Sequence, residues 1–182
     1  MNKQFLKECL LVEVIGGKNK KFSWLRVLRH AWRQPHRRYL LWFRLLSYLY
    51  TNSGAFGKKI ANHYQRKLIK NYHTDISLLA KIKPGLHISH YCAIVITSHC
   101  TIGENFRIRQ NMTIGIKTQG LADTEYNISI GDNVYVGANC CIIGDNINIG
   151  DNVTIGAMSF VNKDIPENSK FYQKRESVIE QQ

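Results

Sequence analysis

The sequence predicts a mainly β fold in which the chain winds into a regular coil, preceded by an α-helical segment. Three observations predict it: a branched apolar residue returns every six residues through the second half, glycine often follows that residue, and the first part of the chain follows helical spacing instead. A period of six fits a chain that turns a corner every six residues and places one apolar side chain inside each time. The residues in step are Ile76, Ile82, Ile88, Ile94, Ile102, Ile108, Ile114, Ile130, Val136, Ile142, Ile149, Ile155 and Val161.

The N-terminal segment, residues 1–74, is predicted to be α-helical. Its apolar residues recur near helical spacing from Trp24 onward. Pro35 is expected to break or begin a helix, because its ring is tolerated only in the first turn. Asn52-Ser53-Gly54 is expected to end that helix, and a second helix is expected at about residues 56–71.

The positive charge of the chain is concentrated in this segment. Residues 1–75 contain 16 Lys and Arg against 3 Asp and Glu, so they hold the whole basic excess of a chain with net charge +12. One interpretation is a packing unit that docks on the coil or on another subunit. The other is a surface for an anionic partner, such as a membrane face or an acidic glycan, since aromatic residues interleaved with arginine in Trp42-Phe43-Arg44 suit an interfacial helix. No nucleic-acid-binding motif is present, so nucleic acid is not an expected partner.

The sequence predicts a cytoplasmic protein, with peripheral association at the inner face of the membrane as an open expectation. No signal peptide is recognisable at the N-terminus. The longest apolar run, residues 39–50, is about half the ~20 residues that a spanning helix needs. The cysteines show no pair at metal-binding spacing, so we expect packed thiols and neither a disulfide framework nor a metal. They are Cys9, Cys92, Cys100, Cys140 and Cys141.

The coil is expected to span residues 75–166, with 167–182 as a C-terminal tail. Gly-Asp-Asn triplets suit its corners, because Gly and Asn tolerate tight or left-handed turns. The period fails in three places. The interval from Ile94 to Ile102 predicts two extra residues near 97–100, and an inserted loop is expected near 116–127. A third, one-residue slip falls between the steps at Ile142 and Ile149. Long excursions from a regular coil are often functional.

The repeated Ile-Gly-Asp-Asn-Val pattern resembles the hexapeptide-repeat acyltransferases, whose fold is a left-handed parallel β-helix. Within that superfamily the chain most resembles the serine acetyltransferase branch. That branch opens its coil with Asp-Ile-x-x-x-Ala-x-Ile, here residues 75–82, and reaches a catalytic histidine fifteen residues after the Asp, here His90. Residues 93–96 and 156–166 also resemble segments of that branch.

Two departures concern the acceptor. The long loop of serine acetyltransferases carries an adjacent Arg-His pair that holds the substrate, and residues 122–127 contain neither. The residue before the catalytic histidine is Ser89, where the serine enzymes usually have Asp. With a shorter N-terminal region as well, the chain is more similar to the enzymes of this branch that modify sugars of capsule, exopolysaccharide or O-antigen. We therefore expect an O-acetyltransferase acting on a cell-surface polysaccharide or its precursor.

The resemblance implies direct transfer of acetyl from acetyl-CoA to a hydroxyl. An alcohol is a weak nucleophile at neutral pH, so a base must take its proton as it attacks the thioester. His90 is the candidate base, and Asp75 is expected to bind the other ring nitrogen and stabilise the imidazolium. His87 is the reserve base. Ser89 and Gln110 are candidate substrate contacts.

Acetyl-CoA is expected to lie in a groove between adjacent subunits, which implies a homotrimer. By resemblance Gly115, Ala138 and Ala157 lie at its contact positions, and Lys163 approaches its phosphates. A backbone N–H near Gly115 is expected to meet the oxyanion of the tetrahedral intermediate.

Three other interpretations stay open. The nearest is serine O-acetyltransferase of cysteine biosynthesis. The second is a non-catalytic β-helix subunit that serves as a scaffold. The third is a metal-dependent β-helix lyase of the γ-carbonic-anhydrase kind, although the spacing of His87, His90 and His99 does not match its ligand pattern.

Overall fold

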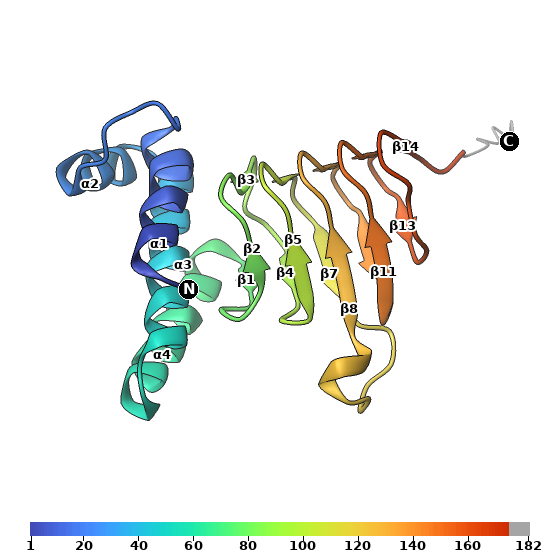
Figure 1. Cartoon of the computed structure of the whole chain (residues 1–182), viewed down its shortest axis with the longest axis horizontal. Helices are drawn as coiled ribbons and strands as arrows, with labels where there is room; N and C mark the ends of the chain where they lie inside the picture. The colour runs from blue at the N-terminus through green and yellow to red at the C-terminus, as the bar shows by residue number, and fades with distance from the viewer. Residues whose placement is uncertain (175–182) are drawn as a thin grey trace, which may run out of the picture.

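The computed structural model describes residues 1–174, which form a helical end and a parallel β-helix (Figure 1). The helices pack over the first coil, and the later coils extend away from them toward the C-terminus. The helical elements are α1 (Lys3–Leu10), the π-helix η1 (Leu11–Ile15), α2 (Trp24–Arg33), α3 (Pro35–Asn52), α4 (Ala55–Tyr72) and the short 3-10 helix η2 (Asp123–Glu125). Pro35 begins α3 and Asn52 ends it, as predicted.

The β-helix consists of three parallel sheets, and successive strands pass from one sheet to the next. Sheet A contains β1 (Thr74–Ile76), β4 (Ile94–Ile96), β7 (Met112–Gly115), β10 (Cys141–Ile143) and β13 (Phe160–Val161). Sheet B contains β2 (Lys81–Ile82), β5 (Cys100–Ile102), β8 (Asn127–Ile130) and β11 (Asn146–Ile149). Sheet C contains β3 (His87–Ile88), β6 (Arg107–Ile108), β9 (Tyr135–Val136), β12 (Thr154–Ile155) and β14 (Lys170–Phe171). The predicted fold class is confirmed, and β14 falls within the segment 167–182 that was expected to be a tail; residues 175–182 lie outside the described part.

The branched residues of the repeat fill the inside of the coil, as predicted. Ile102, Ile108, Ile114 and Val136 are fully buried. Residues of this kind stack on their counterparts one turn later, so each turn buries the apolar side chains of the turn before it.

One register prediction is wrong, because Ile94 is not the residue in step. Ile76 pairs with Ile96, and Ile96 pairs with Ile114, so the repeat runs from Ile88 to Ile96 and on to Ile102. The six-residue interval from Ile96 to Ile102 leaves no extra residues near 97–100. The two extra residues lie instead between β3 and β4.

The inserted loop is where it was predicted. The chain leaves the coil after Gly115 at the end of β7, forms η2, and returns at Asn127 in β8. Asp145, on the next coil, accepts hydrogen bonds from the backbone N–H groups of Lys117 and Thr118, both at 2.9 Å. These bonds lower the pKa of the Asp145 carboxyl and anchor the start of the loop to the coil.

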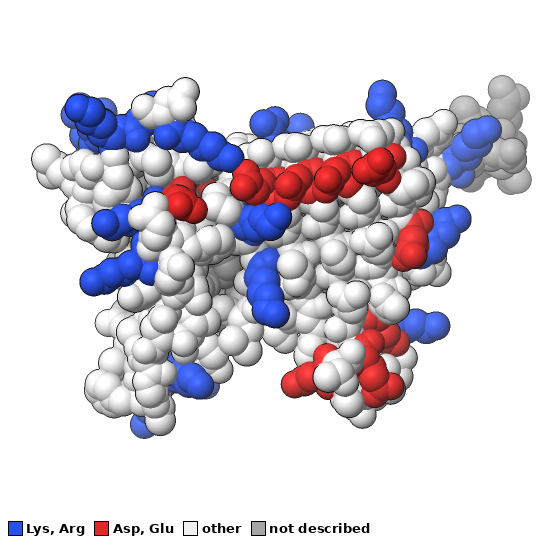
Figure 2. All heavy atoms as spheres, viewed as in Figure 1, with Lys and Arg blue, Asp and Glu red and all other residues white. Residues whose placement is uncertain are grey.

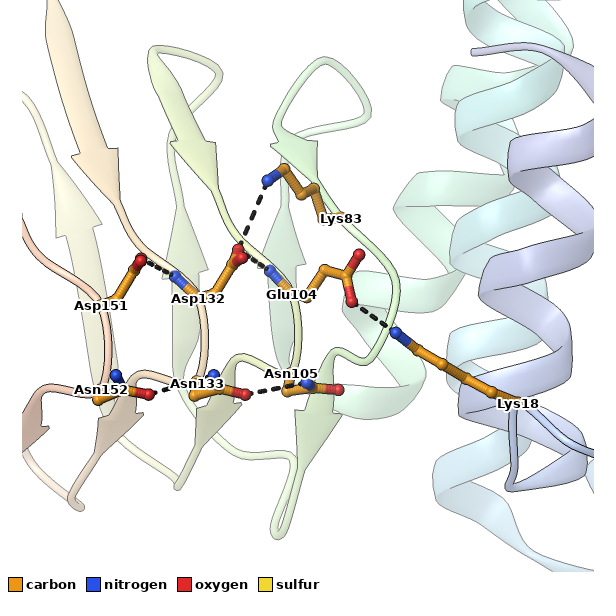
Figure 3. A network of polar contacts seen from close by, with 8 residues as sticks. All are labelled: Lys18, Lys83, Glu104, Asn105, Asp132, Asn133, Asp151 and Asn152. Atoms are coloured by element: carbon orange, nitrogen blue, oxygen red, sulfur yellow. Dashed lines mark hydrogen bonds and ion pairs between the residues drawn. The ribbon is translucent and has the colours of Figure 1, made fainter.

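The corners between sheets B and C form a ladder of polar contacts (Figure 3). The carboxylate of Asp132 accepts from the backbone N–H of Glu104 at 2.7 Å, and that of Asp151 accepts from the backbone N–H of Asp132 at 2.7 Å. Asn133 donates to Asn152 at 3.2 Å on the neighbouring corner.

Asparagine and glycine have separate tasks at these corners. Asn133 and Asn152 take the left-handed conformation, with φ of 59° and 56°. The glycines supply room, because a Cβ on Gly131 would lie 2.7 Å from the backbone N of Asp151. The predicted tight corner is therefore confirmed, with Asn adopting the positive φ and Gly allowing the close approach.

The helices are attached to the first coil by buried polar contacts, including those that Arg44 makes with the carbonyls of Ile82 and Lys83. Arg44 is only 2% exposed, so the expectation that it lies on a surface for an anionic partner is wrong. Near the surface, Lys18 adds an ion pair with Glu104 at 2.6 Å (Figure 3). The packing interpretation of the N-terminal segment is thus correct for the side that faces the coil.

The described residues include no helix that is long and apolar enough to cross a membrane. Three of the cysteines are buried as expected, namely Cys9, Cys100 and Cys140, whereas Cys92 is exposed. Burial raises the pKa of the Cys9 and Cys100 thiols to about 12.

Candidate active site

The two extra residues of the coil enlarge the corner that carries His90. The interval across this corner, from Ile88 to Ile96, is eight residues. The paired intervals on later coils are six residues each: Ile108 to Ile114, Val136 to Ile142 and Ile155 to Val161. Ala93 ends this corner with φ of 50°, and Asn111 ends the next with φ of 54°. His90 and Ser89 are both exposed there. The candidate base thus stands on an outward bulge that no later corner of sheets C and A repeats.

Tyr91, beside His90, anchors this corner to the helices. Its ring lies 5.8 Å from that of Tyr39 on α3 and 5.5 Å from that of Tyr72 at the end of α4. Burial raises the pKa of Tyr39, and the carboxylate of Asp75 adds to that rise. His90 and Asp75 therefore flank the same cluster of three tyrosines.

No hydrogen bond joins Asp75 to His90 in residues 1–174. The Asp75 side chain points outward from β1, and its carboxylate accepts a long bond from Nε2 of Gln65, at 3.5 Å. Asp75 is paired with Val95, and His90 precedes Val95 by one corner of the same coil. The structure thus brings the two residues to the same end of sheet A without closing the predicted contact.

Asp75 and Gly115 share a surface cavity of about 490 Å³ on sheet A. Gln65, Val95 and Ser98 also line this cavity. The cavity extends from the predicted partner of the base to the predicted oxyanion position. It is large enough for a small hydroxyl-bearing acceptor.

The predicted acetyl-CoA contacts form two rows. Ala138 and Ala157 stack at the corner between sheets C and A, in line with the candidate substrate contact Gln110. There the N–H of Asn139 donates to the carbonyl of Gln110 at 3.1 Å, and that of Met158 donates to the carbonyl of Ala138 at 2.8 Å. This row continues the corner that holds His90 along the axis of the coil.

The second row lies at the opposite edge of sheet A. Gly115 ends β7, and Lys163 follows β13 two coils later. The residues fit an extended ligand along the coil, since the first row has small side chains and Lys163 is exposed. The structure does not bring all four predicted contacts together on one edge.

Two buried polar atoms near His90 make no hydrogen bond within the described residues. They are Oη of Tyr91 and Oε1 of Gln110. Buried polar atoms are nearly always hydrogen-bonded, but these two lack a partner among the described residues, and each side chain must turn before it can meet a ligand. Sequence reasoning identified Gln110 and missed Tyr91, and the signal for Tyr91 was its position directly after the candidate base.

His87 lies on β3 of sheet C, three positions before His90, and it lines a different cavity from the one that contains Asp75. It lines a cavity of about 360 Å³ with His36, Arg37 and Arg107. Burial lowers the pKa of His87, and the charge of Arg107 lowers it further. The neighbouring cations oppose protonation of the His87 imidazole. A general base must hold a proton during the reaction, so this setting does not support His87 as the base.

His99 connects the inserted loop to the preceding coil. Its ring lies 4.6 Å from that of Tyr126, and its Nδ1 lies 4.0 Å from the carboxylate of Asp123. The inserted loop, residues 116–127, contains no histidine, but His99 of the coil contacts it through Tyr126. Within residues 1–174, no three side chains of the His, Cys, Asp and Glu types come close enough together to hold a metal ion.

A parallel β-helix with six-residue steps, outward polar corners and a histidine on an enlarged corner is similar to the hexapeptide-repeat proteins. No protein-family model matches the chain. Among curated proteins it is 38% identical over 109 residues to serine acetyltransferase 3, mitochondrial, of Arabidopsis thaliana, and 34% identical over 108 residues to a serine acetyltransferase of Staphylococcus epidermidis. These matches cover 60% and 58% of this chain, and 27% and 47% of those proteins.

Solved structures agree in fold. A serine acetyltransferase from Neisseria gonorrhoeae in complex with serine superposes with a TM-score of 0.64 at 26% identity, covering 94% of this chain and 66% of that one. A soybean serine acetyltransferase in complex with serine gives a TM-score of 0.75 at 21% identity, covering 92% and 67%. The resemblance to the serine acetyltransferase-like branch of left-handed β-helix acyltransferases is therefore confirmed, and the chain spans about a quarter to a half of the length of these curated relatives.

The expected polysaccharide acceptor is contradicted by these matches, because the relatives are serine acetyltransferases. The expectation relied on the absence of Arg and His from residues 122–127 and on Ser89. The fold shows why that argument was weak: His99 contacts the loop from another coil, and Tyr91 adds an unpartnered hydroxyl beside His90. Groups that bind a substrate need not come from the segment in which the sequence pattern places them.

Proposed function

We propose that this chain is an acetyl-CoA-dependent serine O-acetyltransferase. The observation that carries the proposal is the 38% identity over 109 residues to a protein named serine acetyltransferase. The complexes of structural relatives with serine support the same acceptor. The matches cover only part of those proteins, so their names alone do not give the activity of this chain. The proposal therefore also relies on the coil and its site.

In this proposal His90 is the general base. Its neutral imidazole takes the proton of the serine hydroxyl as the oxygen attacks the thioester carbonyl of acetyl-CoA. The tetrahedral intermediate collapses with cleavage of the C–S bond, the proton passes to the departing CoA thiolate, and the products are O-acetylserine and CoA. Asp75 stabilises the transient imidazolium after a change of side-chain rotamer that frees it from Gln65.

The acceptor is proposed to lie between the enlarged corner and the cavity that contains Asp75 and Gly115. Tyr91 and Gln110 offer unpartnered polar atoms on the corner side. Asp75 is the carboxylate of that cavity, so it is also placed to attract the ammonium group of serine. Ser89 is exposed and short, and we assign it a hydrogen bond to the acceptor.

Acetyl-CoA is proposed to bind between two subunits of a homotrimer. The two rows of predicted contacts are separated by the length of a strand of sheet A. A neighbouring subunit offers a way for one ligand to meet both kinds of row. The small residues Ala138 and Ala157 leave room for pantetheine beside the corner. Lys163 supplies a cation for the phosphates.

The experiment is a direct assay of the purified chain with acetyl-CoA and a panel of hydroxyl acceptors. CoA release is followed with a thiol reagent, and the product is identified by mass spectrometry. We expect L-serine to be acetylated on oxygen and to be preferred over L-threonine and over free sugars. Acetylation of sugars without acetylation of serine would contradict the proposal, and no acetyl transfer at all would favour a scaffold.

A further inference from the structure

The helices carry an exposed surface that the acetyl-transfer site does not use. Between residues 14 and 74 the chain has 14 Lys and Arg and no Asp or Glu. Helices α2, α3 and α4 all lie in that interval. Figure 2 shows Lys and Arg gathered over the helical end, with Asp and Glu in one row along the coil and in a group over the inserted loop. The helical end therefore presents a nearly unopposed positive field.

Helix α2 exposes its most apolar face. Trp24, Leu25, Leu28 and Trp32 are 47%, 77%, 58% and 81% exposed. At about 100° per residue these positions fall within one third of the circumference of the helix. Val27, on the other side, is buried against its neighbours. Figure 1 shows α2 at the far end of the molecule from the coil, so the coil does not cover this face.

The same surface continues across α3 and α4 through aromatic and basic side chains. The guanidinium of Arg38 lies 5.7 Å from the ring of Trp32 and donates to its carbonyl at 2.9 Å. Trp42 stacks on Tyr64 at 6.5 Å, and the ammonium of Lys67 lies 5.0 Å from that tyrosine ring. The rings of Trp32 and Tyr64 are thus each adjacent to a cation.

We define the aromatic–basic surface by its eight residues: Trp24, Leu25, Leu28, Trp32, Arg38, Trp42, Tyr64 and Lys67. It contains all three tryptophans of the chain, and each is at least 44% exposed. Four of its residues, Arg38, Trp42, Tyr64 and Lys67, line a hollow of about 250 Å³. Exposed tryptophans are uncommon on a surface that meets only water.

We propose that the aromatic–basic surface docks the protein on an anionic lipid bilayer. Tryptophan and leucine side chains enter the interfacial layer, where the aromatic ring is favoured, and the surrounding arginines and lysines meet the lipid phosphates. Each basic residue near such a surface contributes about 1 kcal/mol. The flanking cations on α2 are Arg26, Arg29 and Arg33.

The composition of the α2 face favours lipid over nucleic acid. Bases stack on aromatic rings, but two of the four residues of this face, Leu25 and Leu28, have no ring to offer. A second copy of this chain would bring two positive surfaces together, which charge repulsion opposes. The inference does not depend on the acceptor of the acetyl group.

Intrinsic fluorescence tests the proposal directly, because all three tryptophans lie on the surface in question. We expect vesicles of phosphatidylcholine with phosphatidylglycerol to shift tryptophan emission to the blue at low salt, and brominated lipid to quench it. Vesicles of phosphatidylcholine alone should give a much smaller effect. Added salt should weaken the binding by screening the cations.

Paired variants separate a docking role from a folding defect. The double variant Leu28→Ser with Trp32→Ser should lower vesicle partitioning at least about tenfold, since it removes most of the apolar face. Tyr172→Ser is the control, because Tyr172 is 65% exposed on the last coil and lies outside the aromatic–basic surface. Thermal unfolding of both variants should match the wild type.

Three results would overturn the inference. The first is equal recovery of the protein in the supernatant with and without anionic vesicles. The second is binding of a single-stranded oligonucleotide with no binding of vesicles, which would assign the surface to nucleic acid. The third is a smaller particle by light scattering for the double variant, with no vesicle binding by the wild type, which would assign it to self-association.

Discussion

The guanidinium of Arg44 on α3 and the carboxylate of Glu13 on η1 form a buried ion pair with two hydrogen bonds, at the place where the helices meet the coil. Nη2 lies 2.6 Å from Oε1 and Nε lies 2.9 Å from Oε2. The remaining donors of Arg44 bind the carbonyls of Ile82 and Lys83 in the first coil, at 2.8 and 3.1 Å. Glu13, only 8% exposed, is the single carboxylate in this junction among the described contacts.

Glu13 completes the junction from its own side. Its Oε1 also accepts from the backbone N–H groups of Gly85 and Leu86, at 3.0 and 3.1 Å. The pair therefore binds backbone atoms on both sides of the turn between β2 and β3. Each charge depends on the other, because either one alone would be buried without its counterion.

Removing one partner of this pair should be strongly destabilising. We expect Arg44→Met to lower the free energy of unfolding by about 3–5 kcal/mol, because it leaves Glu13 buried and unpaired. The double variant Arg44→Met with Glu13→Gln should lose less than Arg44→Met alone. Urea unfolding measures both, and a double variant less stable than the single one would contradict the coupling.

A surface ion pair in the same region provides the matched control. Lys83 lies 3.5 Å from Asp132, and both side chains are well exposed. Lys83→Gln should change the free energy of unfolding by less than about 1 kcal/mol. A loss as large as that of Arg44→Met would mean that burial does not distinguish the two pairs.

Gly137 should tolerate no side chain. A Cβ at this position would lie 2.5 Å from the backbone N of Ala157 on the next coil, so the coils must move apart. We expect Gly137→Ala to cost about 1–3 kcal/mol in thermal or urea unfolding. Gly54→Ala is the control, because no atom lies within 4 Å of its Cβ position, and it should be nearly neutral.

Stability should fall on mild acidification because of the histidines at the cationic cavity. Burial and Arg37 lower the pKa of His36, and burial and Arg107 lower that of His87. A folded pKa below the unfolded value means that the unfolded chain takes up the proton first. The contribution is therefore present above the unfolded pKa of about 6.5 and is lost as the pH falls toward the lower folded values.

The measurement compares urea midpoints between neutral and mildly acidic pH. His36→Gln with His87→Gln should weaken the dependence on pH in this range, because glutamine does not titrate. Glu13 lines the same cavity, but its carboxylate is held by Arg44 and does not counter the histidines. Identical pH dependence in wild type and double variant would contradict the assignment.

Kinetic measurements on variants distinguish the role of His90 as the base from that of Asp75 as its partner. His90→Ala should lower kcat at least about 100-fold with little change in melting temperature, since the side chain is exposed. His87→Ala should leave kcat near that of the wild type. Asp75→Asn should move the acid limb of the kcat/KM profile to lower pH, because the imidazolium loses its counterion. An unmoved profile would remove Asp75 from the mechanism.

The sequence predicted the coil well because its signal is local and repeated. It failed at Ile94 for a specific reason: Ile94 and Ile96 are two residues apart and both are buried in β4, so counting by six fits either. The pairing with Ile76 and Ile114 removes the ambiguity, and pairing is not visible in spacing alone. The enlarged corner was consequently assigned to the wrong side of β4.

The contacts between distant segments could not be predicted. Glu13 and Arg44 are 31 positions apart, and nothing in their neighbours identifies them as partners. The available signal was that residues 1–75 contain only three acidic residues, so that each of them, including Glu13, is unusual in its surroundings. The candidate site was predicted residue by residue through resemblance, and Tyr91 emerged only from the packing of three tyrosines.

The most direct test of the central proposal is the initial rate of CoA release as L-serine is varied at fixed acetyl-CoA. We predict saturable release that requires L-serine, forms O-acetylserine in equal amount, and is lost in His90→Ala but not in His87→Ala. Release that is no faster with L-serine than without it, from protein that is folded and binds acetyl-CoA, would contradict the account.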